Sequence, residues 1–304
     1  MRKILRSLVI LAACLTTAAP GVRAAEAMKF IHPPPENEGD QRHTYYWELL
    51  DAALQANKSK YGDYQLAPYD KPMNFLRAVA ELESGDTGRV NVVARATNLD
   101  LEQRLRPVPI PLDKGLLGYR LFLIMPEMQA RLDKVQSLDD LRQFSIGQAS
   151  PWTDVKILQA ANMKLVIADN YEGLFHMLGI RRYDLFSRGV NEIYSEWEAH
   201  KSSVRGLTIE KNLILQYPMP RYFFVPRTEA GARMAERIED GLQRLAKSGE
   251  FERRYQAYKK LVLADVHLAG RRVFRLPNAQ LSPLAPLHEK FWWDDLAAEL
   301  APKR

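Results

Sequence analysis

Three arginines lie between two apolar runs in the first half of the chain. Arg95, Arg104 and Arg106 separate residues 90–94, which are rich in β-branched side chains, from the apolar run 119–125. A guanidinium is a planar fork with a fixed positive charge, and it matches the two oxygens of a carboxylate. Arginines between buried strands therefore favour an anion site, although a solvated loop would contain them equally well. Arg106 precedes a proline, and we assign it to the solvated surface.

A second candidate seat for an anion is formed by Ser150, Trp152 and Thr153. This segment follows an expected strand and opens an expected helix, where free backbone N–H groups and the helix dipole favour negative charge. The indole of Trp152 can wall a pocket, but it can also pack in a core. Ser150 or Thr153 can likewise be an ordinary helix cap. The segment is thus a candidate ligand site with a purely structural alternative.

Motifs for enzymatic chemistry are absent. The six histidines have no spacing typical of metal ligands, and no nucleophile elbow, phosphate-binding loop or dinucleotide fingerprint occurs. The acids Asp139–Asp140 and Asp294–Asp295 are adjacent pairs, whose side chains diverge on a helix. We therefore expect a protein that is not an enzyme and that needs neither a cofactor nor a metal.

Residues 1–24 are typical of a secretory signal peptide. They begin with basic residues, continue through the apolar run 8–19, which is too short to cross a bilayer, and end with Val22 and Ala24 at a cleavage site. No later stretch is apolar enough for a membrane helix. We expect an exported, periplasmic protein without stable membrane insertion once the signal is removed.

Cys14 is the only cysteine, and it lies inside this signal. Residues 11–14 resemble the lipobox of bacterial lipoproteins, so lipidation of Cys14 is an alternative to conventional cleavage. In either case the folded part has no disulfide, and its stability must come from a packed core.

The charge of the chain argues against a nucleic-acid partner. The formal net charge is +6, but residues 1–24 contain four of the 43 Lys and Arg residues and no acid. The other 39 basic residues face 37 acidic ones, which leaves a net charge of +2. Nucleic-acid-binding domains concentrate far more positive charge.

Apolar periodicity predicts strands and helices in alternation. Strands are expected at residues 28–31, 64–67, 90–94, 144–147, 165–167, 183–186 and 221–225, and helices at 44–54, 72–84, 137–141, 155–163, 171–178 and 229–247. This alternation is the pattern of a parallel sheet covered by helices. Beyond Lys260, several prolines argue against further regular structure until Phe291, Trp292 and Trp293.

Three segments, in this order, resemble the bacterial extracellular solute-binding proteins of the amino-acid-binding type (family 3). Residues 137–141 followed by 146–148 resemble the start of that family's second lobe, residues 182–186 resemble a later strand, and residues 242–258 resemble its final helix pair. The resemblance implies a type II periplasmic-binding-protein-like fold. Such a fold has two α/β sandwich lobes, joined by two hinge strands, that close on a small ligand.

The resemblance also implies the lobe boundaries. The first lobe would be discontinuous, with residues 28–120 plus 226–304, and the second lobe would be residues 121–225. The hinge crossings are expected near residues 119–125 and 222–226.

Site residues follow from the same resemblance. In the family an arginine after the third strand holds the carboxylate of the ligand, in a pattern that Thr97 and Arg104 match here. Arg95 replaces a small residue at the end of that strand and would add a second guanidinium. Amino-acid binders carry an acid for the ammonium group where this chain has Arg188. The departure indicates an anionic, carboxylate-bearing ligand.

These expectations combine into a periplasmic, monomeric solute-binding protein that captures a small anionic ligand between two lobes. Its partner would be an inner-membrane ABC permease or a sensor protein. A degenerate member of the fold that acts through protein contacts in the envelope is the alternative. A dehydratase-like activity, which occurs among relatives of the family, is a further one.

Overall fold

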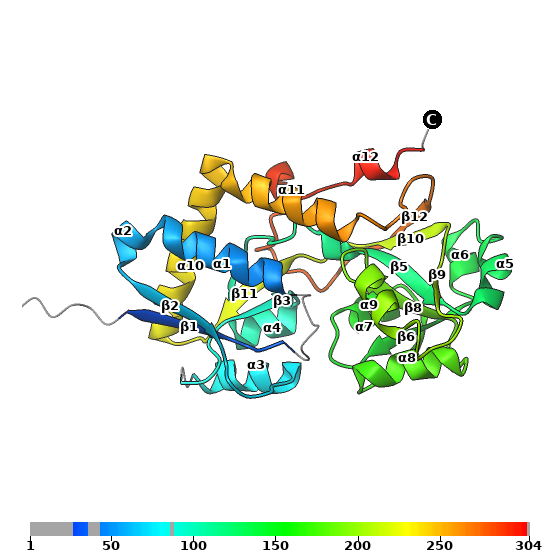
Figure 1. Cartoon of the computed structure of the whole chain (residues 1–304), viewed down its shortest axis with the longest axis horizontal. Helices are drawn as coiled ribbons and strands as arrows, with labels where there is room; N and C mark the ends of the chain where they lie inside the picture. Colours follow the sequence, from blue (N-terminus) through cyan, green and yellow to red (C-terminus); the bar gives the residue numbers. More distant parts are fainter. Residues whose placement is uncertain (1–26, 36–42, 86–87, 303–304) are drawn as a thin grey trace, which may run out of the picture.

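Two α/β lobes lie side by side and are joined at the centre of the molecule (Figure 1). The structure, a computed structural model, describes residues 27–35, 43–85 and 88–302. The expected signal peptide and Cys14 lie outside these residues. Each lobe has its own hydrophobic cores, two in the first lobe and two in the second. The two-lobe fold expected from the sequence is confirmed.

The first lobe contains a parallel strand pair and a three-stranded antiparallel sheet. The pair is β1 (Met28–His32) with β2 (Tyr64–Pro68), and the sheet has the order β3 (Val93–Ala96), β11 (Arg221–Val225), β4 (Arg106–Val108). Its helices are α1 (Thr44–Ala56), α2 (Lys58–Tyr61), α3 (Phe75–Ser84), α4 (Leu99–Arg104), α10 (Glu229–Ser248) and α11 (Glu250–Val262).

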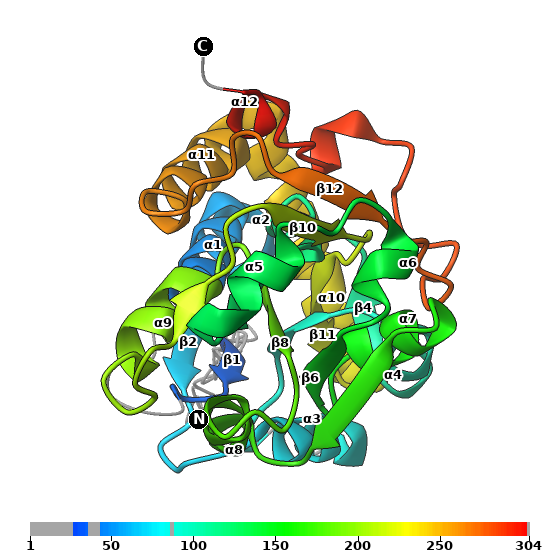
Figure 2. The same ribbon diagram turned by 90° about the vertical axis from the view of Figure 1, so that its right-hand side faces the viewer.

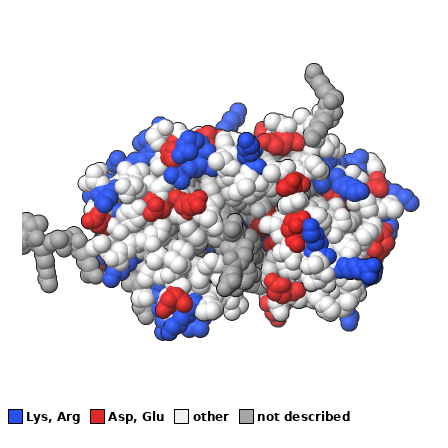
Figure 3. Space-filling view, viewed as in Figure 1, with Lys and Arg blue, Asp and Glu red and all other residues white. Residues whose placement is uncertain are grey.

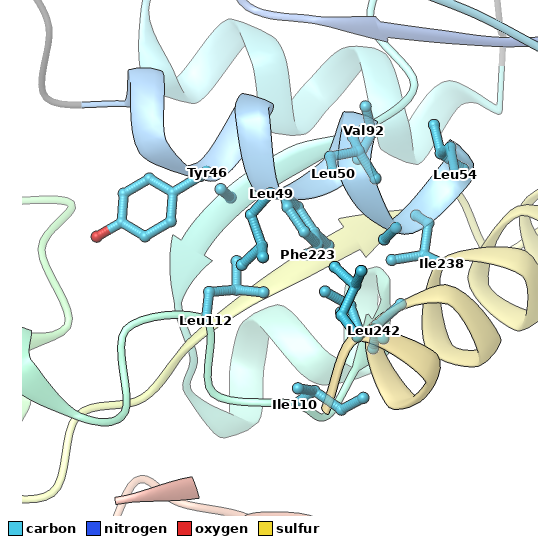
Figure 4. Close-up of a cluster of buried hydrophobic side chains, with 14 of the residues drawn as sticks. Tyr46, Leu49, Leu50, Leu54, Val92, Ile110, Leu112, Phe223, Ile238 and Leu242 are labelled. Atoms are coloured by element: carbon cyan, nitrogen blue, oxygen red, sulfur yellow. The ribbon is translucent and has the colours of Figure 1, made fainter. Parts of the chain in front are cut away.

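The packing of α1 against α10 explains why residues 44–56 form a helix. Tyr46, Leu49, Leu50 and other apolar residues recur every three or four positions and are fully buried. They share a core with Ile238 and Leu242 of α10, whereas the ring of Tyr46, near the start of α1, points away from these two side chains (Figure 4).

The second lobe is built on a mixed sheet with the strand order β12-β10-β5-β8-β6-β7, in which β9 also pairs with β5. Strands β6, β7 and β8 run parallel, as the alternation predicted, whereas β5 is antiparallel to β8 and β10. The strands are β5 (Tyr119–Ile124), β6 (Ser145–Ala149), β7 (Lys164–Ala168), β8 (Leu185–Gly189), β9 (Thr208–Ile209), β10 (Leu213–Gln216) and β12 (Arg272–Arg275).

Short helices cover this sheet. They are α5 (Gln129–Leu132), α6 (Leu138–Leu141), α7 (Asp154–Ala160), α8 (Tyr171–Gly179), α9 (Ile193–His200) and α12 (Ala297–Leu300), with 3-10 turns η1 (Leu116–Gly118) and η2 (Pro126–Met128). A third 3-10 turn, η3 (Lys290–Trp292), lies on the first lobe. Ser137 and Asp140 form a reciprocal capping box at α6, which explains why the helix expected at residues 137–141 begins there.

The crossings between the lobes lie a few residues before the strands in which they were expected. Among the residues that the structure describes, strand β5 pairs only within the second lobe and β11 only within the first, so the chain crosses through residues 109–118 and 217–220. The two crossings adjoin, because the Tyr217 N–H donates to the Gly118 carbonyl oxygen at 3.1 Å. A Cβ on Gly118 would lie 2.1 Å from the Tyr217 carbonyl oxygen, so this close approach requires glycine.

The C-terminal part departs from the expectation in two ways. Residues 272–275 form β12, where no regular structure was expected, and β12 joins the second lobe rather than the first (Figure 2). An edge strand of four residues gives little sequence signal, since its position depends on the partner strand β10. Trp292, by contrast, is buried in the core of the first lobe.

Candidate functional site

A pocket of about 780 Å³ lies between the lobes. The first lobe contributes α1 and α11 to its lining, and the second lobe contributes α8 and α9 (Figure 1). Polar side chains in the lining include Thr44, Glu48, Asn191, Ser195 and His200. A solute bound here would contact both lobes at once.

Tyrosine rings form much of the apolar surface of this pocket. Tyr45 and Tyr258 stack face to face with their centroids 4.0 Å apart, and Tyr171 and Tyr194 come from the second lobe. The Tyr258 hydroxyl accepts a hydrogen bond from Asn191 at 2.8 Å, which joins the lobes beside the pocket. The rings suit an organic solute, because aromatic faces contribute both apolar area and attraction for cations.

Arg188 lies behind the pocket wall, at the end of β8, and its charge is already neutralised. Its guanidinium donates to both carboxylate oxygens of Glu196, at 2.5 and 2.6 Å, and lies 3.1 Å from Glu192. It also lies over the Trp152 ring at 4.4 Å. Burial disfavours the charged form, but the two carboxylates outweigh burial and raise the pKa of Arg188. The expected anion grip is therefore occupied by side chains of the same lobe.

Glu192 connects three buried arginines. Besides Arg188, its carboxylate lies 3.9 Å from Arg120 of β5 and 3.6 Å from Arg221 of β11. Arg120 is also paired with Asp154 at 3.1 Å. Since Arg221 belongs to the first lobe, this network spans the interlobe junction.

Asp113 occupies the first-lobe end of the network. It is completely buried, accepts a hydrogen bond from the Tyr46 hydroxyl at 3.1 Å and lies 4.0 Å from Arg221. Burial raises the pKa of Asp113 to about 6, against the opposing attraction of Arg221. The junction therefore contains a carboxyl group whose pKa burial raises above the usual range of an aspartate.

Arg95 and Thr97 lie on the first-lobe side of the junction, outside the pocket lining. The Arg95 guanidinium is 3.4 Å from one ring nitrogen of His43, and Arg221 is 3.5 Å from the other. Thr97 is fully buried, and its hydroxyl donates to Glu102. Thr97 therefore has an internal partner for its hydroxyl hydrogen.

Arg104 does not join this cluster. It lies in the last turn of α4, where its guanidinium binds Glu83 and Asp100, and 43% of its side chain is exposed. Helix α4 is six residues long, and Arg104 lies on the side of this helix that faces α3 and not on the side that faces the junction. Its spacing of four from Asp100 was the available signal for an ordinary helix pair.

The segment before α7 is brought near the junction through Thr153. The Asn98 side-chain amide donates to the Thr153 hydroxyl at 3.0 Å, a contact between the lobes. Trp152 stacks on Phe186 with the rings 2° from parallel, and it packs on the core of the second lobe. Ser150 is exposed, and its N–H donates to Ala168. Trp152 therefore packs in a core, which was the alternative to a role in the pocket wall. Thr153 has a hydrogen-bond partner on the other lobe.

The sequence did not single out Glu192, Glu196, Arg120, Arg221 or Asp113. A signal for part of the network was present, because Arg188, Glu192 and Glu196 follow one another at intervals of four. Within the described residues, no group of three or more potential ligands could hold a metal ion. Nor is any described helix both long and apolar enough to span a bilayer. The arrangement can bind a solute, and among these residues we find no assembled centre for metal chemistry.

Comparison with known proteins supports the fold. No family model and no curated protein sequence matches the chain. Among solved structures, an ancestral arginine-binding protein bound to arginine matches with a TM-score of 0.52 and 18% identity, over 77% of this chain and 99% of the other.

Two further structures give similar values. A periplasmic binding protein from Salmonella typhimurium with high arginine specificity matches with a TM-score of 0.52 and 14% identity, over 77% of this chain and 99% of the other. A histidine kinase sensor domain that is similar to periplasmic binding proteins has the same TM-score and identity, over 77% of this chain and 96% of the other. The resemblance to amino-acid-binding periplasmic proteins is thereby confirmed at the level of the fold.

Proposed function

We propose that this protein is a solute-binding protein that holds a small organic molecule in the pocket between its lobes. The observation that carries the proposal is the lining of that pocket by α1 and α11 of one lobe and α8 and α9 of the other. Ligands of periplasmic binding proteins act by bridging two lobes in this way. The neighbours that bind arginine or glutamine have the same two-lobe fold.

The ligand we propose bears a carboxylate and also a cationic group. The purely anionic ligand expected from the sequence rested on Arg95, Arg104 and Arg188, and two of these, Arg104 and Arg188, have carboxylate partners. The pocket presents acids, Glu48 and Glu172, together with Arg253 and Arg254 of α11, two guanidiniums that share the single carboxylate of Glu250 and so keep a net positive charge. Because both signs of charge line it, a zwitterion finds complementary groups at two points.

The cellular role we propose is delivery of the solute to an inner-membrane ABC permease or its report to a sensor protein. The neighbours include a substrate-binding protein of an amino-acid ABC transporter and a histidine kinase sensor domain, which are consistent with these two roles. Acidic and basic side chains are interspersed on the face seen in Figure 3, without a patch of one sign. The periplasm is the compartment in which both roles occur.

A thermal-shift screen of the purified protein tests the proposal. Arginine, glutamine, succinate and phosphate esters represent the zwitterionic, dicarboxylate and other anionic classes, and a saturable rise in Tm marks binding. Ser195→Trp places an indole in the pocket and should abolish the shift. Ser203→Trp is the matched control, because Ser203 is exposed on the turn after α9 and outside the pocket lining.

A second candidate function is the degenerate scaffold, which acts through protein contacts. This candidate is favoured by Glu192 and Glu196, because their carboxylates already neutralise Arg188, which the sequence suggested as a ligand-binding residue. No thermal response to any of the solute classes would support this candidate. A response that survives Ser195→Trp would instead place the ligand elsewhere in the protein.

A further inference from the structure

The segment after α11 passes repeatedly from one lobe to the other. We call residues 263–302 the C-terminal strap. Its first part lies on the second lobe, its middle part returns to the first lobe, and its end lies on the second lobe again (Figures 1 and 2, orange to red). Among the described residues, the strap contributes to the second-lobe cores both before and after its contribution to the first-lobe core.

The first anchor of the strap is β12, on the edge of the second-lobe sheet. The Arg272 N–H donates to the Asn212 carbonyl oxygen at 2.7 Å, and the Leu276 N–H donates to that of Gln216 at 2.8 Å. Leu276 is 4% exposed and belongs to the second-lobe core. A strand held by main-chain hydrogen bonds and a buried leucine moves with that lobe.

The second anchor lies on the first lobe. The Leu99 N–H at the start of α4 donates to the Gln280 carbonyl oxygen at 3.0 Å. Trp292 is buried in the core of the first lobe and contacts Phe251 of α11 edge-on, with ring centroids 5.1 Å apart. This part of the strap therefore moves with the first lobe.

The third anchor follows within four residues of Trp292. The Asp294 carboxylate accepts hydrogen bonds from Tyr255 and Lys259 of α11, both at 2.8 Å. Leu296, two residues later, is completely buried in the core of the second lobe. A chain of four residues thus connects two buried anchors on different lobes, and its short length leaves little slack.

We propose that the C-terminal strap fixes the angle between the two lobes, so that the protein loads its solute with little hinge motion. Rotation about residues 109–118 and 217–220 would change the separation of the lobes. Each anchor of the strap would then have to slide or leave its core, and close-packed cores do not deform continuously. The pocket between α1, α11, α8 and α9 would be present before ligand arrives.

Distances between two spin labels, one on each lobe, test this proposal. Arg77→Cys on α3 and Lys156→Cys on α7 are exposed label sites, in a chain whose Cys14 is replaced by Ser. We expect a single narrow distance distribution in this labelled parent chain. Trp292→Ala combined with Leu296→Ala should broaden the distribution about twofold or more, because it removes two anchors on different lobes.

Leu284→Ala is the matched control, since Leu284 lies in the same strap but is 54% exposed. It should leave the distribution as narrow as in the parent. Far-UV circular dichroism shows whether the double variant is folded. If it is not, a protease site is inserted after Pro283 and the folded, labelled protein is cut there, which interrupts the strap. The distance distribution of the cut chain is then compared with that of the parent. The proposal is overturned if the distance distribution of the parent is as broad as that of the double variant or the cut chain. It is equally overturned if the double variant or the cut chain keeps a distribution as narrow as that of the parent. Neither outcome needs a ligand, so the test is independent of the proposed function.

Discussion

Glu192 of the second lobe lies 3.6 Å from Arg221 of the first lobe, at the point where the two lobes meet. The same carboxylate also contacts Arg120 and Arg188, so three buried guanidiniums share it in addition to their other acidic partners. Such a network stabilises a structure only as long as every charge keeps its partner, because an unpaired buried ion loses its hydration without compensation. The junction is therefore sensitive to single substitutions.

Glu192→Gln should lower the free energy of unfolding by about 3 kcal/mol, since it keeps the shape of the side chain and leaves three arginines with less compensation. Urea denaturation followed by circular dichroism measures this change. Glu198→Gln is the control, because Glu198 pairs with Lys201 on the exposed surface, where a pair contributes less than about 1 kcal/mol. Equal losses in the two variants would show that Glu192 has no special role at the junction.

Asp113 should make the stability depend on pH between its ordinary pKa and its folded-state value. Burial raises the folded-state pKa to about 6, so the unfolded chain ionises first as the pH rises from about 4 to 6. The unfolded state then binds fewer protons than the folded state, and the contribution of this group to stability falls over that window.

Asp113→Asn should remove this contribution and flatten the dependence between pH 4 and 6. The free energy of unfolding from urea titrations at several pH values measures the slope. Asp139→Asn changes an acid whose side chain is 84% exposed, and it should keep the slope of the parent. An unchanged slope in Asp113→Asn would mean that another group titrates in this window.

Arg188 and Arg104, which the sequence suggested for the same task, should behave differently when replaced by alanine. Arg188→Ala leaves Glu192 and Glu196 buried without their main partner and should destabilise the protein by about 3–5 kcal/mol. Arg104→Ala breaks pairs at a side chain that is 43% exposed and should cost less than about 1 kcal/mol.

Thermal unfolding measures both effects, and a ligand titration of Arg104→Ala adds a second readout. Because Arg104 lies outside the junction, we expect that variant to keep the solute-induced shift in Tm. Loss of that shift would return Arg104 to the binding site as the sequence first suggested.

The elements of the fold were largely predictable because they depend on local pattern. Strands β6, β7 and β8, the helix from Thr44 and the capping box at Ser137 each have their signal within a few consecutive residues. Strands β9 and β10 of the same sheet were not predicted. Strand β12 was missed because its formation depends on β10, about 60 positions earlier in the chain. Local periodicity contains no information on such a partner.

The site was less predictable than the fold. Arg95, Thr97 and Thr153 lie near the interlobe junction but do not line the pocket, so their role in ligand binding stays a prediction. The partners that neutralise Arg188 come from α9, and those of Arg221 come from two lobes. Whether an arginine is open to a ligand or paired internally is decided by these tertiary contacts, which residue type alone cannot reveal.

Gly115 offers a test of the packing between the first crossing and the C-terminal strap. Its φ of +76° is a conformation that favours glycine, and a Cβ placed there would lie 2.5 Å from the Trp293 ring. Gly270 has a nearly identical φ of +75° with nothing within 4 Å of such a Cβ. Replacing either glycine with alanine introduces backbone strain of about 1–2 kcal/mol, because alanine disfavours a positive φ. Only Gly115→Ala also introduces a steric clash.

We therefore expect Gly115→Ala to lower the Tm by clearly more than Gly270→Ala does. The excess should shrink in a background with Trp293→Ala, because the side chain that meets the new methyl group is then gone. Differential scanning calorimetry of the four variants gives this double-mutant comparison directly. If the excess persists without the indole, the cost of Gly115→Ala arises from its backbone, and Trp293 is not packed against the crossing segment.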